Sequence, residues 1–117
     1  MSEPLPADFL ITEAQHQDRI IELARDLGWL VGSTKDSRGS EDGEPDLRMV
    51  HPVQGRAIVI ECKDQRGRYR KAREAPKSGR LLPGQDDWAE AYKACPGVEY
   101  YLSRPSDWDE MKEILLP

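Results

Sequence analysis

The chain has 117 residues, of which 38% are hydrophobic and 33% are charged, and its formal net charge is -5. This size and composition fit one globular domain with a single modest core, and they exclude an intrinsically disordered chain. No apolar run reaches the roughly 20 residues of a membrane span, and the N-terminus lacks the pattern of a signal peptide, so we expect a cytoplasmic protein.

A helix is predicted near the start of the chain. Thr12 and Gln15 have the spacing of a capping box, and apolar residues then recur at helical spacing until Gly28. We therefore expect a helix over residues 13–27. His16 and His51 are interpreted as surface residues near the ends of elements.

Three strands are predicted next. They cover residues 29–31, 47–50 and 57–60, which are short apolar runs rich in β-branched side chains. The segment 32–44 is rich in Gly, Ser and Asp and is expected to be a loop. A turn at residues 54–55 would join the last two strands into a hairpin.

The segment 66–80 is strongly basic although the chain as a whole is acidic. It carries seven cations against one anion, Glu74, which is a local net charge of +6. With Pro76 and Gly79 and little periodicity, it is expected to be a mobile loop or an irregular arm with a disordered tip. It is either a solvated loop or an arm that follows DNA phosphates. The seven cations are Arg66, Arg68, Arg70, Lys71, Arg73, Lys77 and Arg80.

The last third of the chain predicts a helix, a strand and a second helix. Pro83 fits the first turn of a helix that ends at Pro96-Gly97, residues 98–102 are strand-like, and residues 105–116 have helical spacing. The predicted order is α-β-β-β-α-β-α, an α/β fold with a mixed, mostly antiparallel sheet. The side chains expected in the core from this part are Trp88, Ala91, Tyr92, Cys95, Trp108, Met111, Ile114 and Leu115, and Trp29 is expected there too.

Three charged residues are predicted to meet at the hairpin. Glu61 and Lys63 point to the same face of a strand because side chains alternate, and the apolar residues before them indicate that this strand end is buried. Asp46 would lie beside Glu61 if the two strands pair in antiparallel register. The protein usually supplies two carboxylates to a Mg²⁺ site, and water molecules and a phosphate oxygen complete the coordination.

Glu13 lies on the apolar stripe of the first helix, within about 40° of Gln17 and Ile20 on a helical wheel. It is either a third carboxylate at the metal or a residue that favours the positive end of the helix dipole. Cys62 and Cys95 have neither disulfide nor zinc-ligand spacing, which fits a reducing compartment.

These residues resemble a known family. Pro45-Asp46 followed by Glu61-Cys62-Lys63 is similar to the split signature of the PD-(D/E)XK nuclease superfamily. The wider pattern, which covers nearly the whole chain, resembles the stand-alone VRR-NUC nucleases common in phages. It includes Gln17, Gly28-Trp29, Asp36-Ser37-Arg38 and Leu82-Pro83-Gly84-Gln85. The segment from about Tyr69 to Gly79 looks like an insertion relative to this family, and the arginine pair for which the family is named is not evident.

The resemblance implies a restriction-endonuclease-like core and a DNA endonuclease that uses Mg²⁺ or Mn²⁺, with no organic cofactor. Asp46, Glu61 and the Cys62 backbone carbonyl would then be metal ligands, and Lys63 would orient or activate the attacking water. Glu13 and Gln85 match the accessory catalytic positions of the family, and Glu13 is also the candidate third carboxylate at the metal. Gln85 is otherwise an ordinary first-turn helix residue.

We expect DNA as the partner, a branched or nicked duplex as a sensible target, and a homodimer, because one minimal domain reaches only one strand. The alternatives are a non-catalytic DNA-binding module with the same fold and an accessory or RNA-directed domain of a larger complex. Tyr69 is a candidate for stacking on a base.

Overall fold

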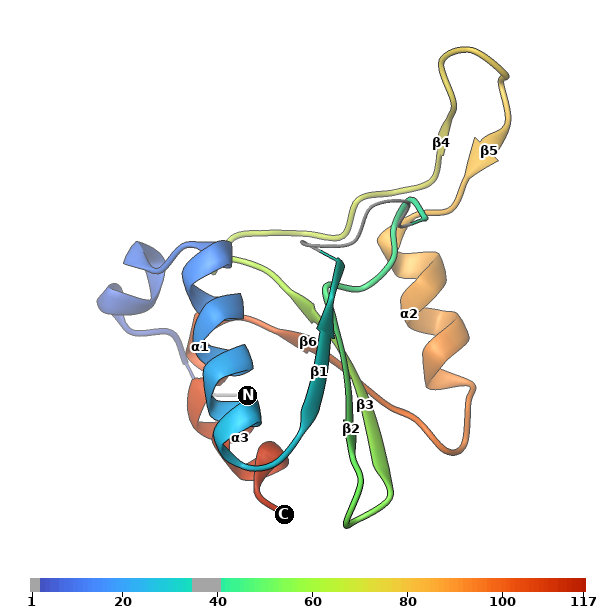
Figure 1. The fold of residues 1–117 in the computed structure, drawn as a ribbon. Helices are drawn as coiled ribbons and strands as arrows, with labels where there is room; N and C mark the ends of the chain where they lie inside the picture. Colours follow the sequence, from blue (N-terminus) through green and yellow to red (C-terminus); the bar gives the residue numbers. More distant parts are fainter. Residues whose placement is uncertain (1–2, 35–40) are drawn as a thin grey trace.

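The computed structural model describes residues 3–34 and 41–117, which form a mixed α/β fold (Figure 1). Its α-helices are α1 (Glu13–Asp26), α2 (Gln85–Lys93) and α3 (Trp108–Leu115). Its strands are β1 (Leu30–Ser33), β2 (Leu47–His51), β3 (Arg56–Cys62), β4 (Arg73–Glu74), β5 (Leu81–Leu82) and β6 (Glu99–Ser103). Short 3₁₀ helices cover Pro6–Leu10 and Pro105–Asp107. No helix in this described part is both long and apolar enough to cross a membrane.

The main sheet has four strands in the order β1-β2-β3-β6. The pairs β1–β2 and β2–β3 are antiparallel, whereas β3 and β6 are parallel. A parallel pair needs a long crossover, and α2 lies in that connection. The prediction of a mixed, mostly antiparallel sheet flanked by helices is confirmed.

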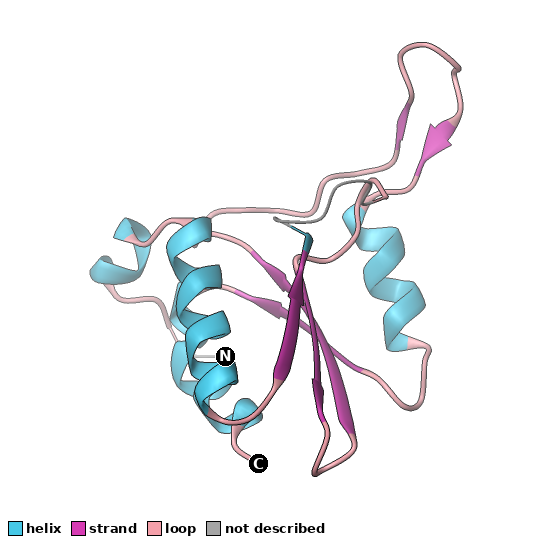
Figure 2. Ribbon diagram, in the orientation of Figure 1, coloured by secondary structure: helices cyan, strands magenta, loops and turns pink. Residues whose placement is uncertain are grey.

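The core lies between the sheet and the pair α1 and α3, while α2 stands on the other side of the sheet (Figure 2). Strand β2 alternates buried and exposed residues, as expected of a strand with one covered face. In β3 the residues from Ile58 to Cys62 are all buried, because this central strand is covered on both faces. The core side chains are Ile20, Ala24, Trp29, Leu47, Met49, Ile58, Ile60, Cys62, Met111 and Leu115.

The second helix is shorter than predicted at both ends, because α2 covers only Gln85–Lys93 and stops before the predicted end at Pro96-Gly97. Pro83 lies outside α2, and Gly84 is the residue before its first turn, where its N–H donates to the Asp87 side chain at 2.8 Å. Ala91 and Cys95 are exposed, so the predicted apolar side of this helix is wrong at those two positions. Trp88 is half-buried, and its indole N–H donates to the Asp42 carbonyl at 2.9 Å.

Both histidines are buried, which contradicts the prediction that they lie on the surface. His16 Nε2 lies 2.8 Å from Ser103 Oγ, and its Nδ1 accepts from Arg19 Nε at 3.1 Å, so Nε2 carries the proton. His51 Nε2 donates to the Leu27 carbonyl at 3.1 Å, and its Nδ1 accepts from the Gln54 N–H. Both nitrogens of each ring have hydrogen-bond partners, which offsets the cost of burying the ring.

The basic segment is more regular than predicted. Strands β4 and β5 pair in antiparallel register, Arg73 opposite Leu82, and form a ribbon that projects beyond the end of α2 (Figure 1). The Ala75 N–H donates to the Arg80 carbonyl at 2.8 Å and closes the tip. The expectation of an irregular arm is therefore wrong at the ribbon. Two-residue strands are too short to give a periodic sequence pattern.

Candidate active site

The register of β2 and β3 brings two carboxylates together. Because Leu47 pairs with Ile60, the preceding Asp46 lies beside Glu61. The Asp46 N–H donates to Glu61 Oε1 at 3.2 Å, and the Cys62 N–H donates to Asp46 Oδ2 at 2.8 Å. The predicted pairing of these two acids is confirmed.

Lys63 follows β3 and points to the same place. Its Nζ lies 3.8 Å from Glu61 Oε2 and 3.9 Å from Glu13 Oε1. The Lys63 N–H donates to the Ser103 carbonyl at 3.0 Å, which extends the β3–β6 ladder and fixes its backbone. The first turn of α1 thus delivers Glu13, half exposed, to the solvent side of the buried pair of Glu61 and Lys63.

Gln85 comes from the first turn of α2 and connects two parts of the site. Its Nε2 donates to Glu61 Oε2 at 2.7 Å, and its Oε1 accepts from the Arg70 N–H at 2.7 Å. Its own N–H donates to the Arg70 carbonyl at 2.7 Å. One glutamine therefore orients the buried carboxylate and holds the start of the basic segment against the site.

Gly84 permits this close approach. A Cβ atom there would lie 2.7 Å from the Arg70 carbonyl oxygen and 2.6 Å from the Ala72 nitrogen, closer than real Cβ contacts. A larger residue would push the basic segment away from α2. The glycine before α2 thus has a packing reason.

Negative charge is in excess at this strand end. Burial and the neighbouring Asp46 raise the pKa of Glu61 to about 8, although Lys63 opposes the shift. Burial also raises the pKa of Glu13, again against the effect of Lys63. Three carboxylates share one ammonium group here, so a cation would stabilise the ionised pair.

The available donors have the chemistry that Mg²⁺ or Mn²⁺ requires. Asp46, Glu61 and Glu13 offer carboxylate oxygens, which hard cations prefer. The Cys62 thiol lies in the core and its pKa is raised by burial, so only the backbone of this residue is suited to the site. Within residues 3–34 and 41–117, no three His, Cys, Asp or Glu side chains already stand close enough to hold a metal ion.

A basic groove adjoins the site. It is an open hollow of about 900 Å³. It contains Arg104, which the sequence analysis did not select and whose Nη2 donates to the Gly67 carbonyl at 2.8 Å. Arg104 directly follows Ser103, the partner of Cys62 in the parallel pair β3–β6, so it reaches the groove through that pairing, which no local sequence pattern encodes. The residues that line the groove are Gln65, Arg66, Gly67, Arg68, Tyr69, Lys71 and Arg104.

The seven predicted DNA-binding cations do not form one patch. Arg66, Arg68 and Lys71 line the groove, whereas Lys77 and Arg80 belong to the projecting ribbon. Lys71 pairs with Asp86 and Arg73 pairs with Asp42, each at 3.0 Å. These two aspartates reduce the positive charge that the sequence count assigned to the segment.

Tyr69 also lines the groove, but its hydroxyl lies 3.0 Å from the Tyr100 hydroxyl. That contact ties the segment to β6. Asp36, Ser37 and Arg38 lie outside the described residues.

A comparison of the chain with protein-family models, curated proteins and solved structures found no match.

Proposed function

We propose that this chain is a metal-dependent nuclease that hydrolyses phosphodiester bonds in DNA, with a reduced PD-(D/E)XK core. The observation that carries the proposal is the meeting of Asp46, Glu61 and Lys63 at one buried strand end, where Glu13 and Gln85 join them from two different helices. Five residues from four separate segments of the chain share one small volume. A perturbed buried acid beside a second acid is typical of a functional site.

The proposed metal is Mg²⁺ or Mn²⁺, held by Asp46, Glu61 and the Cys62 carbonyl, with Glu13 as a further oxygen donor. When bound, it would polarise the phosphoryl oxygen and lower the pKa of the attacking water. The excess of carboxylates over Lys63 supports this assignment.

The protein's own residues have distinct roles in this proposal. Lys63 Nζ orients the water and offsets the negative charge that develops on the phosphoryl oxygens. Gln85 is a positioning residue, because it holds Glu61 Oε2 through its amide. Arg104 and the cations of the basic groove bind phosphates on the strand that leads to the site.

The test is cleavage of supercoiled, linear, single-stranded and four-way-junction DNA in Mg²⁺, Mn²⁺ or EDTA. Wild-type protein should cut with either metal and not in EDTA. Asp46→Ala and Lys63→Ala should each lose at least about 10³-fold in rate, the size of effect seen when a group that stabilises the transition state is removed. The controls are Asp109→Ala and Lys112→Ala, which remove a matched exposed pair on α3.

Three other results would change the proposed site, activity or substrate. Full activity of Asp46→Ala would refute the assigned site. Binding of DNA by the wild type without any cutting would favour the non-catalytic binding module or an accessory domain that needs a partner. Cutting of RNA but not of DNA would show that RNA is the substrate. The preference for branched or nicked duplex and the homodimer stay predictions, to be tested by the junction substrate and by sedimentation.

A further inference from the structure

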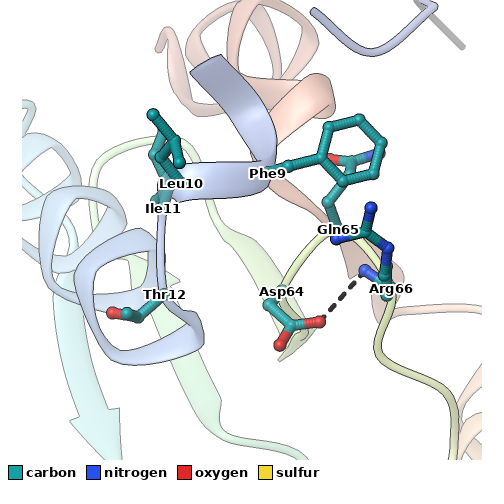
Figure 3. Close-up of a pocket in the computed structure, with 7 residues that line it drawn as sticks. All are labelled: Phe9, Leu10, Ile11, Thr12, Asp64, Gln65 and Arg66. Atoms are coloured by element: carbon teal, nitrogen blue, oxygen red, sulfur yellow. Dashed lines mark hydrogen bonds between the residues drawn. The ribbon is translucent and has the colours of Figure 1, made fainter. Parts of the chain in front are cut away.

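A small cavity lies between the N-terminal 3₁₀ helix and the segment that follows Lys63 (Figure 3). Its volume is about 180 Å³, below the roughly 300–1,000 Å³ of pockets for drug-sized ligands. An occupant would therefore have the size of a single ring system. The lining residues are Phe9, Leu10, Ile11, Thr12, Asp64, Gln65 and Arg66.

The cavity is adjacent to the proposed catalytic residues. Thr12 on one wall directly precedes Glu13, and Asp64 on the other wall directly follows Lys63. The contact of 3.9 Å between Lys63 Nζ and Glu13 Oε1 joins the two walls. A nucleotide next to a phosphate bound at Lys63 is therefore within reach of the cavity.

The lining has one flat apolar surface and polar groups around it. Phe9 is 40% exposed, and the Arg66 guanidinium lies 4.5 Å from the centre of its ring. The face of Phe9 thus already accepts a planar polar group, and the exposed Arg66 side chain is long enough to move and stack on an inserted ring.

The cavity lacks the net positive charge of a phosphate site, because the Asp64 carboxylate offsets the Arg66 guanidinium that also lines it. The Asp64 carboxylate is directed toward Arg66, whose N–H it accepts at 3.0 Å, and it would repel an anion while accepting a hydrogen bond from an amino group (Figure 3). Gln65 is held by two hydrogen bonds to Ser106, each 3.0 Å long, so this wall is fixed. A flat ring with amino groups on its edge is the matching ligand.

The cavity adjoins the basic groove. Gln65 and Arg66 line both, so the two hollows share a wall. In the groove, Arg68 and Arg104 are available for phosphates, and Tyr69 presents a second ring. The order from one hollow to the other is a ring-binding site followed by a phosphate-binding site, which matches a nucleotide strand whose bases are not stacked in a duplex.

We propose that the Phe9 cavity binds one unstacked nucleobase of the strand to be cut, so that the enzyme acts on DNA with a single-stranded segment next to the scissile phosphate. This inference rests on the proposed function, because it takes the Lys63 site as the place of cleavage. The substrate is then DNA with an unpaired strand, and not an intact duplex.

The test is a binding measurement that does not need cleavage. Fluorescence anisotropy in EDTA gives the Kd of labelled single-stranded DNA and of a blunt duplex for wild type, Phe9→Ala, Phe9→Trp and Leu5→Ala. Phe9→Ala should weaken single-strand binding about tenfold, within the range for loss of one stacked base, and leave duplex binding unchanged. Phe9→Trp should restore binding. Leu5 is 66% exposed on the same segment and does not line the cavity, so Leu5→Ala should match wild type.

An abasic-site series adds a readout that misfolding would not reproduce. One abasic position, moved along the strand, should weaken wild-type binding about tenfold at a single place and have no such effect on Phe9→Ala. Equal affinity of Phe9→Ala and Leu5→Ala for single strands, or equal losses on single strands and duplex, would overturn the inference while leaving a metal-dependent activity intact. Phe9-dependent binding without any cleavage would support the cavity and refute the proposed function.

Discussion

Two buried polar clusters lie near the end of the parallel pair β3–β6 and differ in charge. In one, His16, Arg19 and Ser103 form a chain of hydrogen bonds around a neutral imidazole. In the other, Glu61 is buried beside Asp46, and Lys63 is the cation within 4 Å. Both clusters satisfy their hydrogen bonds, so satisfaction does not distinguish them.

The distinguishing property is net charge. Burial, with a contribution from Arg19, lowers the pKa of His16 to about 4, so that cluster avoids adding a second positive charge. Burial and Asp46 raise the pKa of Glu61 to about 8, so that cluster keeps an acid in a place where its ionised form is costly. A fold that needed only stability would replace such an acid by a neutral side chain. The comparison therefore supports a structural role for the first cluster and the proposed function for the second.

The largest expected effect concerns Glu61. Because its folded-state pKa lies above the ordinary value of 4.5, its protonated form favours the native state below pH 4.5, and this stability is lost as the pH rises to about 8. In EDTA, Glu61→Gln should therefore gain stability relative to wild type by a few kcal/mol between pH 5 and pH 8. Urea unfolding at both pH values measures this, and Glu22→Gln on the exposed side of α1 is the control. If Glu61→Gln has the same unfolding free energy as wild type at both pH values, ionised Glu61 does not destabilise the fold.

A smaller effect of opposite sign is expected at His16. Its folded-state pKa lies below the ordinary value of 6.5, so its contribution is complete above pH 6.5 and is lost as the pH falls to about 4. The loss is at most about 3 kcal/mol. His16→Gln keeps a donor for Ser103 but does not titrate, so its unfolding free energy should fall less than that of wild type from pH 7 to pH 4.5. Parallel curves for the two proteins would show that His16 is not a buried neutral base.

Much of the candidate site could be predicted because it depends on local geometry. Strand alternation aligns Glu61 with Lys63, and one short hairpin brings Asp46 opposite Glu61. The burial of His16 was also present in the sequence, since Ile20 and Ala24 follow it at intervals of four on the buried face of α1. The polarity of His16 predicts a surface position, whereas its spacing from Ile20 and Ala24 predicts burial, and the spacing is correct.

The remainder depends on contacts between distant segments. The parallel pairing of β3 with β6 brings Arg104 to the site, and no local pattern encodes that pairing. Gln85 was selected from the resemblance alone, because its contact with Glu61 depends on how α2 packs on the sheet. Asp42 and Asp86 were not expected to neutralise cations of the basic segment, since each pair joins two separate loops or helix ends.

The smallest effect tests the basic segment against the buried site. Replacing Arg70, Lys71 and Arg73 by Gln should weaken duplex binding about tenfold and flatten its salt dependence, because cations that contact phosphates release counterions. Three full phosphate contacts would lower the slope of log K against log salt by about 3. Since Lys71 and Arg73 already have the partners Asp86 and Asp42, we expect a decrease nearer 1 to 2. The control triple, Arg25, Lys93 and Lys112 to Gln, removes equal charge elsewhere.

The aspartate partners make this prediction sharper. Asp42→Asn and Asp86→Asn release the two paired cations without changing any cation, so together they should strengthen binding and steepen the salt slope. If the double variant behaves as wild type, Lys71 and Arg73 do not contact phosphates, and the positive charge that matters lies in the groove with Arg66, Arg68 and Arg104. If the slope of the cation triple is unchanged as well, the segment contributes structure through Arg70 and Gln85 and not affinity.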